Sequence, residues 1–96
     1  MNINFEKNDK VLTVSLDGRL DTNTAPELEK LLNDKYEGVD FIVFDLEKLI
    51  YVSSAGLRVL LTAHKRMKGN MKLTSVTELV MEVFDMTGFS DILVIE

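Results

Sequence analysis

The sequence predicts an α/β fold in one small domain, residues 1–96, with a mixed, mostly parallel sheet of four or five strands and about three packed helices. Two observations predict it. Segments with the period of a strand alternate with segments of helical period in the order β-β-α-β-α-β-α-β, which is typical of parallel sheets with helical connections. A hydrophobic content of 46% with 28% charged residues is that of a folded globular chain.

The first two strands are expected to form an antiparallel hairpin. Asn2–Glu6 is a short strand candidate, and in Val11–Leu16 every second residue is apolar, as in a half-buried strand. The polar run Lys7–Lys10 between them suits a tight turn. Asp17 and Gly18 are expected to close the second strand.

A first helix is expected after the polar loop Arg19–Asn23. Thr24 is placed to be its N-cap, with Glu27 three residues later as the reciprocal residue of a capping box. Pro26 suits the first turn, where its missing N–H group costs little. Gly38 ends the helical region.

The central strand is expected over Val39–Leu46. This run is close to continuously apolar, which is typical of a parallel strand covered on both faces. Residues Glu47–Val52 are expected to be a connector. Asp45 near the end of the strand is expected to accept hydrogen bonds from loop N–H groups.

A second helix is expected from about Ser54 to Met67, with Gly69 and Asn70 ending it. One broad arc of this helix is apolar, and His64 lies in the middle of that arc, which favours a packed or hydrogen-bonded core histidine. The expected apolar positions are Leu57, Leu60, Leu61, Ala63, His64 and Met67.

The remaining elements follow the same alternation. Met71–Thr74 is a strand candidate, and Ser75 with Glu78 repeats the capping-box spacing before a third helix. Gly88 is expected to end that helix, and the apolar run Ile92–Ile95 to form a last short strand.

The composition excludes several classes of function. The chain has no cysteine, so disulfide and thiolate chemistry are absent, and with one histidine a metal site would rest on carboxylates. The net charge of −5 argues against direct nucleic-acid binding. No signal-peptide pattern and no membrane-spanning apolar run is visible, so we expect a cytoplasmic protein without membrane insertion.

The charge is unevenly placed along the chain. No acidic residue lies between Glu47 and Glu78, and that interval holds six of the 11 basic residues, so the remainder carries five basic and 16 acidic residues, or −11. A basic segment in an acidic protein indicates a specific anionic contact, or simply a solvated helix face. Its basic residues are Lys48, Arg58, Lys65, Arg66, Lys68 and Lys72.

Ser53 and Ser54 stand where the second helix opens. A serine at this point is either an ordinary N-cap or a place where phosphate is added, because helix N-termini favour negative charge. Ala55 and Gly56 in the first turn either let another molecule approach the open N–H groups or pack closely on the sheet. Arg58 follows Ser54 by one turn, which places it near the Ser54 oxygen or leaves it in solvent.

The chain resembles the STAS domain of bacterial anti-sigma factor antagonists. The segment Asp45–Leu57 is similar to that family's motif of a strand ending in Asp-Leu, a connector, and then Asp-Ser-(Ser/Thr/Ala)-Gly-Leu opening a helix. Gly18–Asp21 resembles its Gly-x-(Leu/Ile)-Asp motif, and Phe84–Phe89 resembles its late Leu-x-(Leu/Met)-(Thr/Ser)-Gly-Leu segment. The likeness covers essentially the whole chain.

The resemblance implies a binding module without catalysis or cofactor. In its unphosphorylated form it would bind an anti-sigma factor that is a GHKL-type serine kinase and so release a sigma factor, and a PP2C-type phosphatase would reverse the phosphorylation. The implied acceptor is Ser54, which we expect also to be the N-cap of the second helix. Ser53 stands where the family has aspartate, which leaves the efficiency of phosphorylation open. We expect a monomer or weak dimer. The implied supporting or partner-binding residues are Asp21, Thr22, Ser53, Ala55, Gly56 and Arg58.

Two other functions remain open from the sequence. The first is a STAS adaptor subunit of a membrane transporter complex, docking through the second helix without phosphorylation. The second is an aspartyl-phosphate receiver built on Asp45, since open α/β sheets place active groups at strand ends. A receiver needs further carboxylates for Mg²⁺, and only Asp17 and Asp21 are expected nearby.

Overall fold

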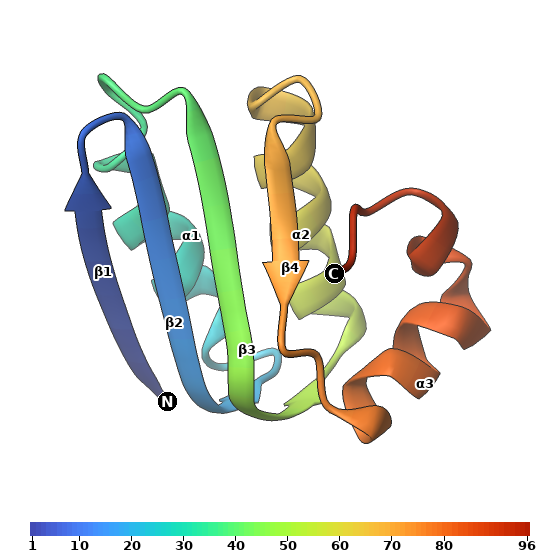
Figure 1. Cartoon of the computed structure of the whole chain (residues 1–96). Coiled ribbons are helices and arrows are strands. Elements are labelled where there is room, and N and C mark those ends of the chain that lie inside the picture. The colour runs from blue at the N-terminus through green and yellow to red at the C-terminus, as the bar shows by residue number, and fades with distance from the viewer.

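The computed structural model describes all of residues 1–96. A four-stranded sheet has the order β1-β2-β3-β4, with β1 antiparallel to β2 and the other neighbours parallel. Helices α1 and α2 lie behind this sheet, and α3 lies to one side beyond β4 (Figure 1). The strands are β1 Asn2–Asn8, β2 Val11–Leu20, β3 Phe41–Val52 and β4 Met71–Thr74; the helices are α1 Ala25–Asn33, α2 Ser54–Arg66, α3 Glu78–Thr87 and the 3₁₀ turn η1 Phe89–Asp91.

The predicted α/β class, the hairpin and the three helices are confirmed. The first helix ends earlier than expected, at Asn33 with Asp34 as its C-cap and not at Gly38. Both hairpin strands are longer than expected: β1 continues to Asn8, and the turn is reduced to Asp9 and Lys10, with Asp9 at φ 58°. β2 does not close at Asp17 but runs on to Leu20. Register shifts against β3 allow this extension.

The expected connector Glu47–Val52 is the second half of β3. Leu49 and Val52 are buried there and pair with Gly18 and Leu20 of the extended β2. The expectation that β3 is covered on both faces is wrong. Ile42, Phe44 and Leu46 are buried under the helices, whereas the alternate side chains face the open side of the sheet and are half-buried, because no helix covers that side (Figure 1).

The expected last strand Ile92–Ile95 is only a single parallel bridge between Leu73 and Ile95. Leu73 N donates to Val94 O at 2.8 Å, and Glu96 N donates to Leu73 O at 2.9 Å. The turn η1 uses the residues before this bridge, so too little extended chain is left to pair further with β4. The C-terminal segment therefore covers the edge of β4 without adding a strand.

The third helix begins later than its expected cap predicts. Ser75 has φ 55° and is not a cap; Thr77 is the N-cap and its hydroxyl accepts from Val80 N at 3.4 Å. The Thr77 hydroxyl also donates to Leu49 O at 3.1 Å, which ties the start of α3 to β3. Gly88 ends the helix at φ 81°, as expected.

Helix α2 packs on the sheet through Gly56 at its first turn. A Cβ built on Gly56 would lie 2.7 Å from Leu20 Cγ, 2.9 Å from Leu20 O and 2.9 Å from Val52 Cγ2. Gly56 is therefore buried against the ends of β2 and β3, and its side is closed to any other molecule.

We predict that Gly56→Ala destabilises the fold. Alanine is the better helix former by about 1 kcal/mol, but the backbone oxygen of Leu20 cannot move aside cheaply, and overpacking costs about 1–3 kcal/mol. Urea denaturation is expected to show a net loss of about 1 kcal/mol or more. The matched control is Thr62→Ala at an exposed position of the same helix. Equal stability of the two variants would show that the close contact is absent.

Candidate functional site

The site lies where β2 and β3 end side by side. Leu20 and Val52 are the last paired residues, and Ser53 N donates to Leu20 O at 2.9 Å, so the pairing leads directly into α2. Asp21 follows one strand and Ser54 follows the other. The parallel strands thus bring the two principal predicted site residues to one edge of the sheet, where open α/β sheets bind their ligands.

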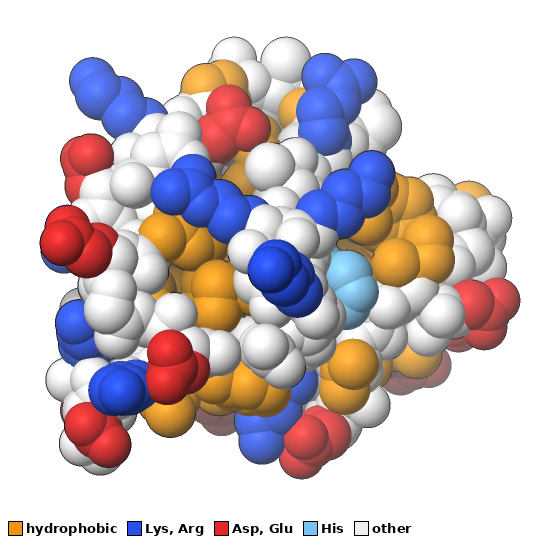
Figure 2. Space-filling view, turned by 90° about the horizontal axis from the view of Figure 1, so that it is seen from above, with side chains coloured by type: hydrophobic (Ala, Val, Ile, Leu, Met, Phe, Trp, Pro, Cys, Tyr) orange, Lys and Arg blue, Asp and Glu red, His pale blue; other side chains and the backbone are white.

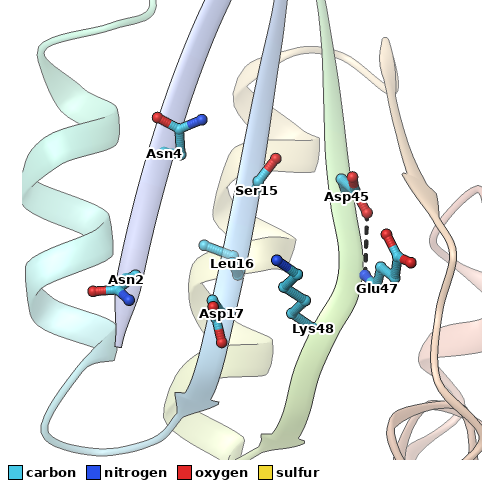
Figure 3. Close-up of a pocket in the computed structure, with 8 residues that line it drawn as sticks. All are labelled: Asn2, Asn4, Ser15, Leu16, Asp17, Asp45, Glu47 and Lys48. Carbon is cyan, nitrogen blue, oxygen red and sulfur yellow. Dashed lines mark hydrogen bonds between the residues drawn. The ribbon is translucent and has the colours of Figure 1, made fainter.

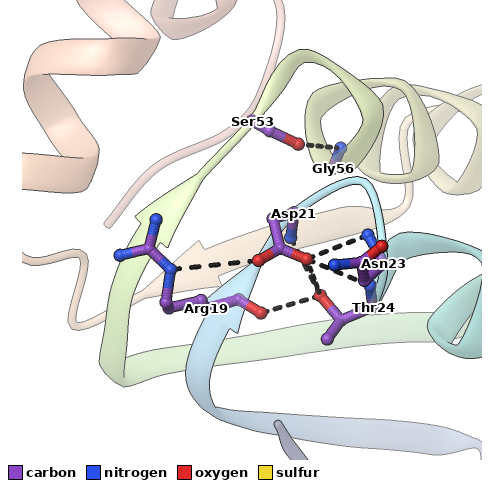
Figure 4. Close-up of polar contacts among 6 residues, drawn as sticks. All are labelled: Arg19, Asp21, Asn23, Thr24, Ser53 and Gly56. Atoms are coloured by element: carbon purple, nitrogen blue, oxygen red, sulfur yellow. Dashed lines mark hydrogen bonds and ion pairs between the residues drawn. The ribbon is translucent and has the colours of Figure 1, made fainter.

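Ser53 is the N-cap of α2. Its backbone is extended, with φ −96° and ψ 175°, and its Oγ accepts from Gly56 N at 3.3 Å (Figure 4). The prediction that Ser54 caps the helix is therefore wrong, because the chain turns helical one residue earlier than a Ser54 cap requires. Aspartate, which the family motif has here, is as good an N-cap as serine. Ser53 thus retains the capping role of that aspartate and omits its charge.

Ser54 is the first residue of α2 and is exposed. Because Ser53 supplies the cap, the Ser54 hydroxyl is not needed by the helix. The first turn contains no acidic residue, so no side chain of its own offsets the positive end of the helix dipole. A phosphate on Ser54 would lie at a helix end suited to bind it.

The other predicted residues of the α2 turn are divided between the core and solvent. Ala55 is half-buried and Gly56 buried, so both serve the packing on the sheet. Arg58 is exposed, and its side chain takes part in none of the ion pairs or side-chain hydrogen bonds of the structure. It is free to turn toward a phosphate on Ser54, one helical turn away.

Asp21 is held by the loop that follows β2. Its Oδ1 accepts from Asn23 N at 3.0 Å and Thr24 N at 3.2 Å, and its Oδ2 lies 3.8 Å from Arg19 Nε (Figure 4). The N–H groups of Asn23 and Thr24 hold the pKa of Asp21 below its ordinary range, aided by the Thr24 hydroxyl and Arg19 and opposed by partial burial. Thr22 in the same loop is exposed.

The expected capping box at α1 is not formed. Thr24 makes no side-chain cap; its Oγ1 instead donates to Arg19 O at 2.7 Å and accepts from Asp21 N at 2.8 Å. The hydroxyl is directed back to the end of β2, so Thr24 serves the loop that carries Asp21. The start of α1 is supported by the backbone, since Ala25 N donates to Asp21 O at 2.8 Å.

One pair of residues in this region was missed in the sequence. The Arg19 guanidinium lies 4.3 Å from the centre of the Tyr51 ring, and the two residues are cross-strand partners in β2 and β3. Arg19 thereby links Tyr51 to Asp21. Alternation along Leu49–Val52 could have revealed this pair, had that segment been predicted as a strand.

The basic segment does not gather around Ser54. Lys65 and Arg66 lie at the other end of α2, about 18 Å from Ser54 at 1.5 Å per residue. There Arg66 stacks 4.0 Å from the Tyr36 ring and donates to Asn33 Oδ1 at 3.4 Å. Figure 2 looks onto this end and shows several Lys and Arg side chains on it. These residues therefore make a solvated basic end distant from the predicted acceptor.

Asp45 accepts from Glu47 N at 3.1 Å, but Glu47 belongs to β3, so the expectation that Asp45 ends the strand and bonds loop N–H groups is wrong. It lies within β3 on the open face of the sheet, where it lines a shallow polar hollow with Asp17, Lys48 and neighbouring side chains (Figure 3). No group of three or more His, Asp or Glu side chains is arranged to hold a metal ion.

His64 is half-buried, and its buried Nδ1 has no hydrogen-bond partner.

Comparison with known proteins identifies the family. A model of the STAS domain matches residues 2–96. The chain is 32% identical over 97 residues to the anti-sigma-B factor antagonist of Bacillus subtilis, covering 97% of this chain and 88% of the relative. It is 32% identical over 99 residues to the anti-sigma-B factor antagonist of Staphylococcus aureus, covering 97% and 92%. The chain therefore belongs to the STAS domain family, as its motifs predicted.

The fold is also that of solved STAS proteins. The structure of the anti-sigma factor antagonist SpoIIAA in its unphosphorylated form matches with a TM-score of 0.84 at 18% identity, over 99% of this chain and 88% of that one. At this identity the likeness establishes the fold alone. None of the helices has the length together with the apolar character that a membrane-spanning segment requires.

We predict that alanine substitutions at the two serines change the free energy of unfolding by different amounts. Ser53→Ala removes the cap of α2 and is expected to cost about 1 kcal/mol in urea denaturation, whereas Ser53→Asp restores the cap. Ser54→Ala, at an exposed position that caps nothing, is expected to change stability by no more than about 0.5 kcal/mol. Equal losses in the two alanine variants would contradict the assignment of the cap to Ser53.

Asp21 is expected to contribute stability that depends on pH. Because its pKa is lowered in the folded chain, its contribution is complete at neutral pH and is lost as the pH falls through the lowered pKa. The stability advantage of the wild type over Asp21→Asn should therefore shrink on acidification, as followed by thermal unfolding between neutral and strongly acidic pH. Thr22→Ala is the control and should keep the wild-type pH dependence. An advantage over Asp21→Asn that does not change with pH would refute this role.

Proposed function

We propose that the protein is an anti-sigma factor antagonist. In this function it binds an anti-sigma factor and so releases a sigma factor, as the names of its relatives in Bacillus and Staphylococcus suggest. Residues 1–96 act as one STAS domain in the cytoplasm, with no catalysis or cofactor of their own. The binding surface is the edge of the sheet around the start of α2, with Asp21, Thr22, Ser53 and Ser54.

Ser54 is the proposed acceptor of phosphate. The observation that carries this proposal is the separation of the two serine hydroxyls: Ser53 caps α2, and Ser54 is left exposed beside a helix end without an acidic neighbour in its first turn. The anti-sigma factor is itself the kinase, of GHKL type. Ser54 Oγ attacks the γ-phosphorus of ATP, the bond to ADP breaks, and the hydroxyl proton passes to a base of the kinase. A PP2C-type phosphatase hydrolyses the ester.

Phosphorylation switches the binding through local charge. The phosphate adds about −1.5 to −2 charges at neutral pH. The free N–H groups of the first turn and Arg58 can satisfy it within this chain, so the fold need not change. At the partner surface the same phosphate would have to be buried against atoms that fit a neutral hydroxyl. Because burying a charge that has lost its water is costly, this weakens binding by about several kcal/mol.

We predict one phosphate per chain after incubation with ATP and an anti-sigma factor kinase from the same organism, measured by intact-protein mass. Ser54→Ala should abolish the added mass and keep the binding of the kinase, while Ser54→Asp should bind it about tenfold or more weakly. Ser53→Asp should still be phosphorylated, because aspartate supplies the same cap.

The control is Ser90→Ala, at a half-buried serine in η1, which should be phosphorylated like the wild type. Phosphate on a residue other than Ser54 would overturn the assignment. Binding to transporter subunits that is indifferent to both Ser54 variants would instead support a transporter adaptor.

A further inference from the structure

Helix α3 has an unusual outer surface. Val80 and Phe84 face the core and are fully buried, and much of the remaining surface of the helix is open to solvent. Surface helices place polar residues there. In α3, however, Leu79 is 64% exposed and Met86 is 85% exposed. With the half-buried Val83 they are spaced at i, i+4 and i+7, so they form one apolar row along the helix.

This apolar row is part of a local concentration of exposed hydrophobic groups. Seven large hydrophobic residues are exposed in the whole chain, and four of them, Leu79, Met86, Ile92 and Val94, belong to α3 and the segment after it. Figure 2 shows hydrophobic side chains gathered on the side of the molecule where the C-terminal segments lie. Single exposed hydrophobics are ordinary, but their concentration in one segment of the chain favours an interaction surface.

An acidic row runs beside the apolar one. Glu78, Glu82 and Asp85 have the same i, i+4, i+7 spacing, one position earlier, so this row lies about 100° around the helix from the first. None of the three takes part in an ion pair. The chain from 78 to 96 contains five acidic and no basic residues, so nothing in that segment neutralises the row.

These two rows define the chemistry of their partner. The matching surface is a helix with one row of apolar side chains next to one row of Lys or Arg. A second copy of this chain fits poorly, because two α3 helices would oppose acid to acid. Helix α2 has basic residues on its exposed face, but none of the exposed large hydrophobics belongs to it. The occupant is therefore a different protein.

The start of α3 is bonded to the strand that leads to Ser54. Thr77 holds the start of α3 to Leu49 O in the second half of β3, and Ser54 follows the end of the same strand. Leu79 and Ser54 therefore lie toward the same end of the molecule, as the starts of α2 and α3 do in Figure 1. One partner can engage both.

We infer that α3 is a second docking site for the anti-sigma factor, which it binds through a basic amphipathic helix of that protein. This inference rests on the function proposed above and adds to it a contact that does not involve the acceptor. The α3 contact supplies affinity in the unphosphorylated complex and brings the kinase to Ser54.

The test uses the full chain and the kinase that phosphorylates it. Leu79→Ser and Met86→Ser change exposed side chains and should keep the wild-type thermal stability. Each should weaken kinase binding by about tenfold, as for a central interface residue. In phosphorylation of Ser54 each should raise KM and leave kcat unchanged, because neither touches the reacting atoms. Glu82→Lys should weaken binding most at low salt.

The matched control is Val11→Ser, at a 38% exposed hydrophobic on β2, which should bind like the wild type. If Ser54 is phosphorylated but the α3 variants keep wild-type binding and KM, this inference is wrong and the proposed function stands. If no such kinase binds the wild-type chain, the proposed function fails and this inference fails with it.

Discussion

The close contact between the first turn of α2 and the ends of β2 and β3 is the constraint on which the site depends. Because Gly56 has no Cβ, the helix backbone lies directly against Leu20 and Val52. This approach lets Ser53 N bond Leu20 O, so the chain passes from strand to helix without a loop. The positions of Asp21 and Ser54 follow from that junction, since each is the first or second residue beyond a paired strand end. A side chain at position 56 would push α2 away from the strand ends and so separate Ser54 from Asp21.

The junction also explains why two serines stand together. A cap must hold its oxygen against a backbone N–H group, whereas a phosphate acceptor must leave its oxygen free for another molecule. One hydroxyl cannot meet both demands, and Ser53 and Ser54 divide them. An aspartate at position 53 would cap equally well but would place a negative charge next to a phosphate on Ser54. The departure from the family motif therefore changes the charge around the acceptor and preserves its geometry.

Local periodicity was sufficient to predict the hairpin, the three helices and the edge at which Asp21 and Ser54 meet. Local periodicity failed where contacts between residues far apart in the sequence determine the structure. The second half of β3 was read as a connector because the register shifts against β2 interrupt the alternation near Glu47. The N-caps of α2 and α3 differ from the expected ones for a similar reason. Several hydroxyls are available at each helix start, and contacts with Leu20 and Leu49 select Ser53 and Thr77. The apolar run before Ile95 resembles a strand, but η1 leaves it one bridge.

The distribution of charge over the folded molecule differs from the distribution along the sequence. Lys65 and Arg66 lie at the far end of α2 from Ser54, whereas the acidic row of α3 begins at the end of the molecule where Ser54 lies, so a partner of this edge would be basic. A phosphate would attract such a partner at long range, yet the proposed switch requires release. The two effects act at different distances. Exposed charges more than about 8 Å apart are screened at physiological salt, whereas burying a phosphate against a surface shaped for a hydroxyl is costly at contact. Release must therefore originate at the Ser54 contact itself, and attachment through α3 can persist without opposing it.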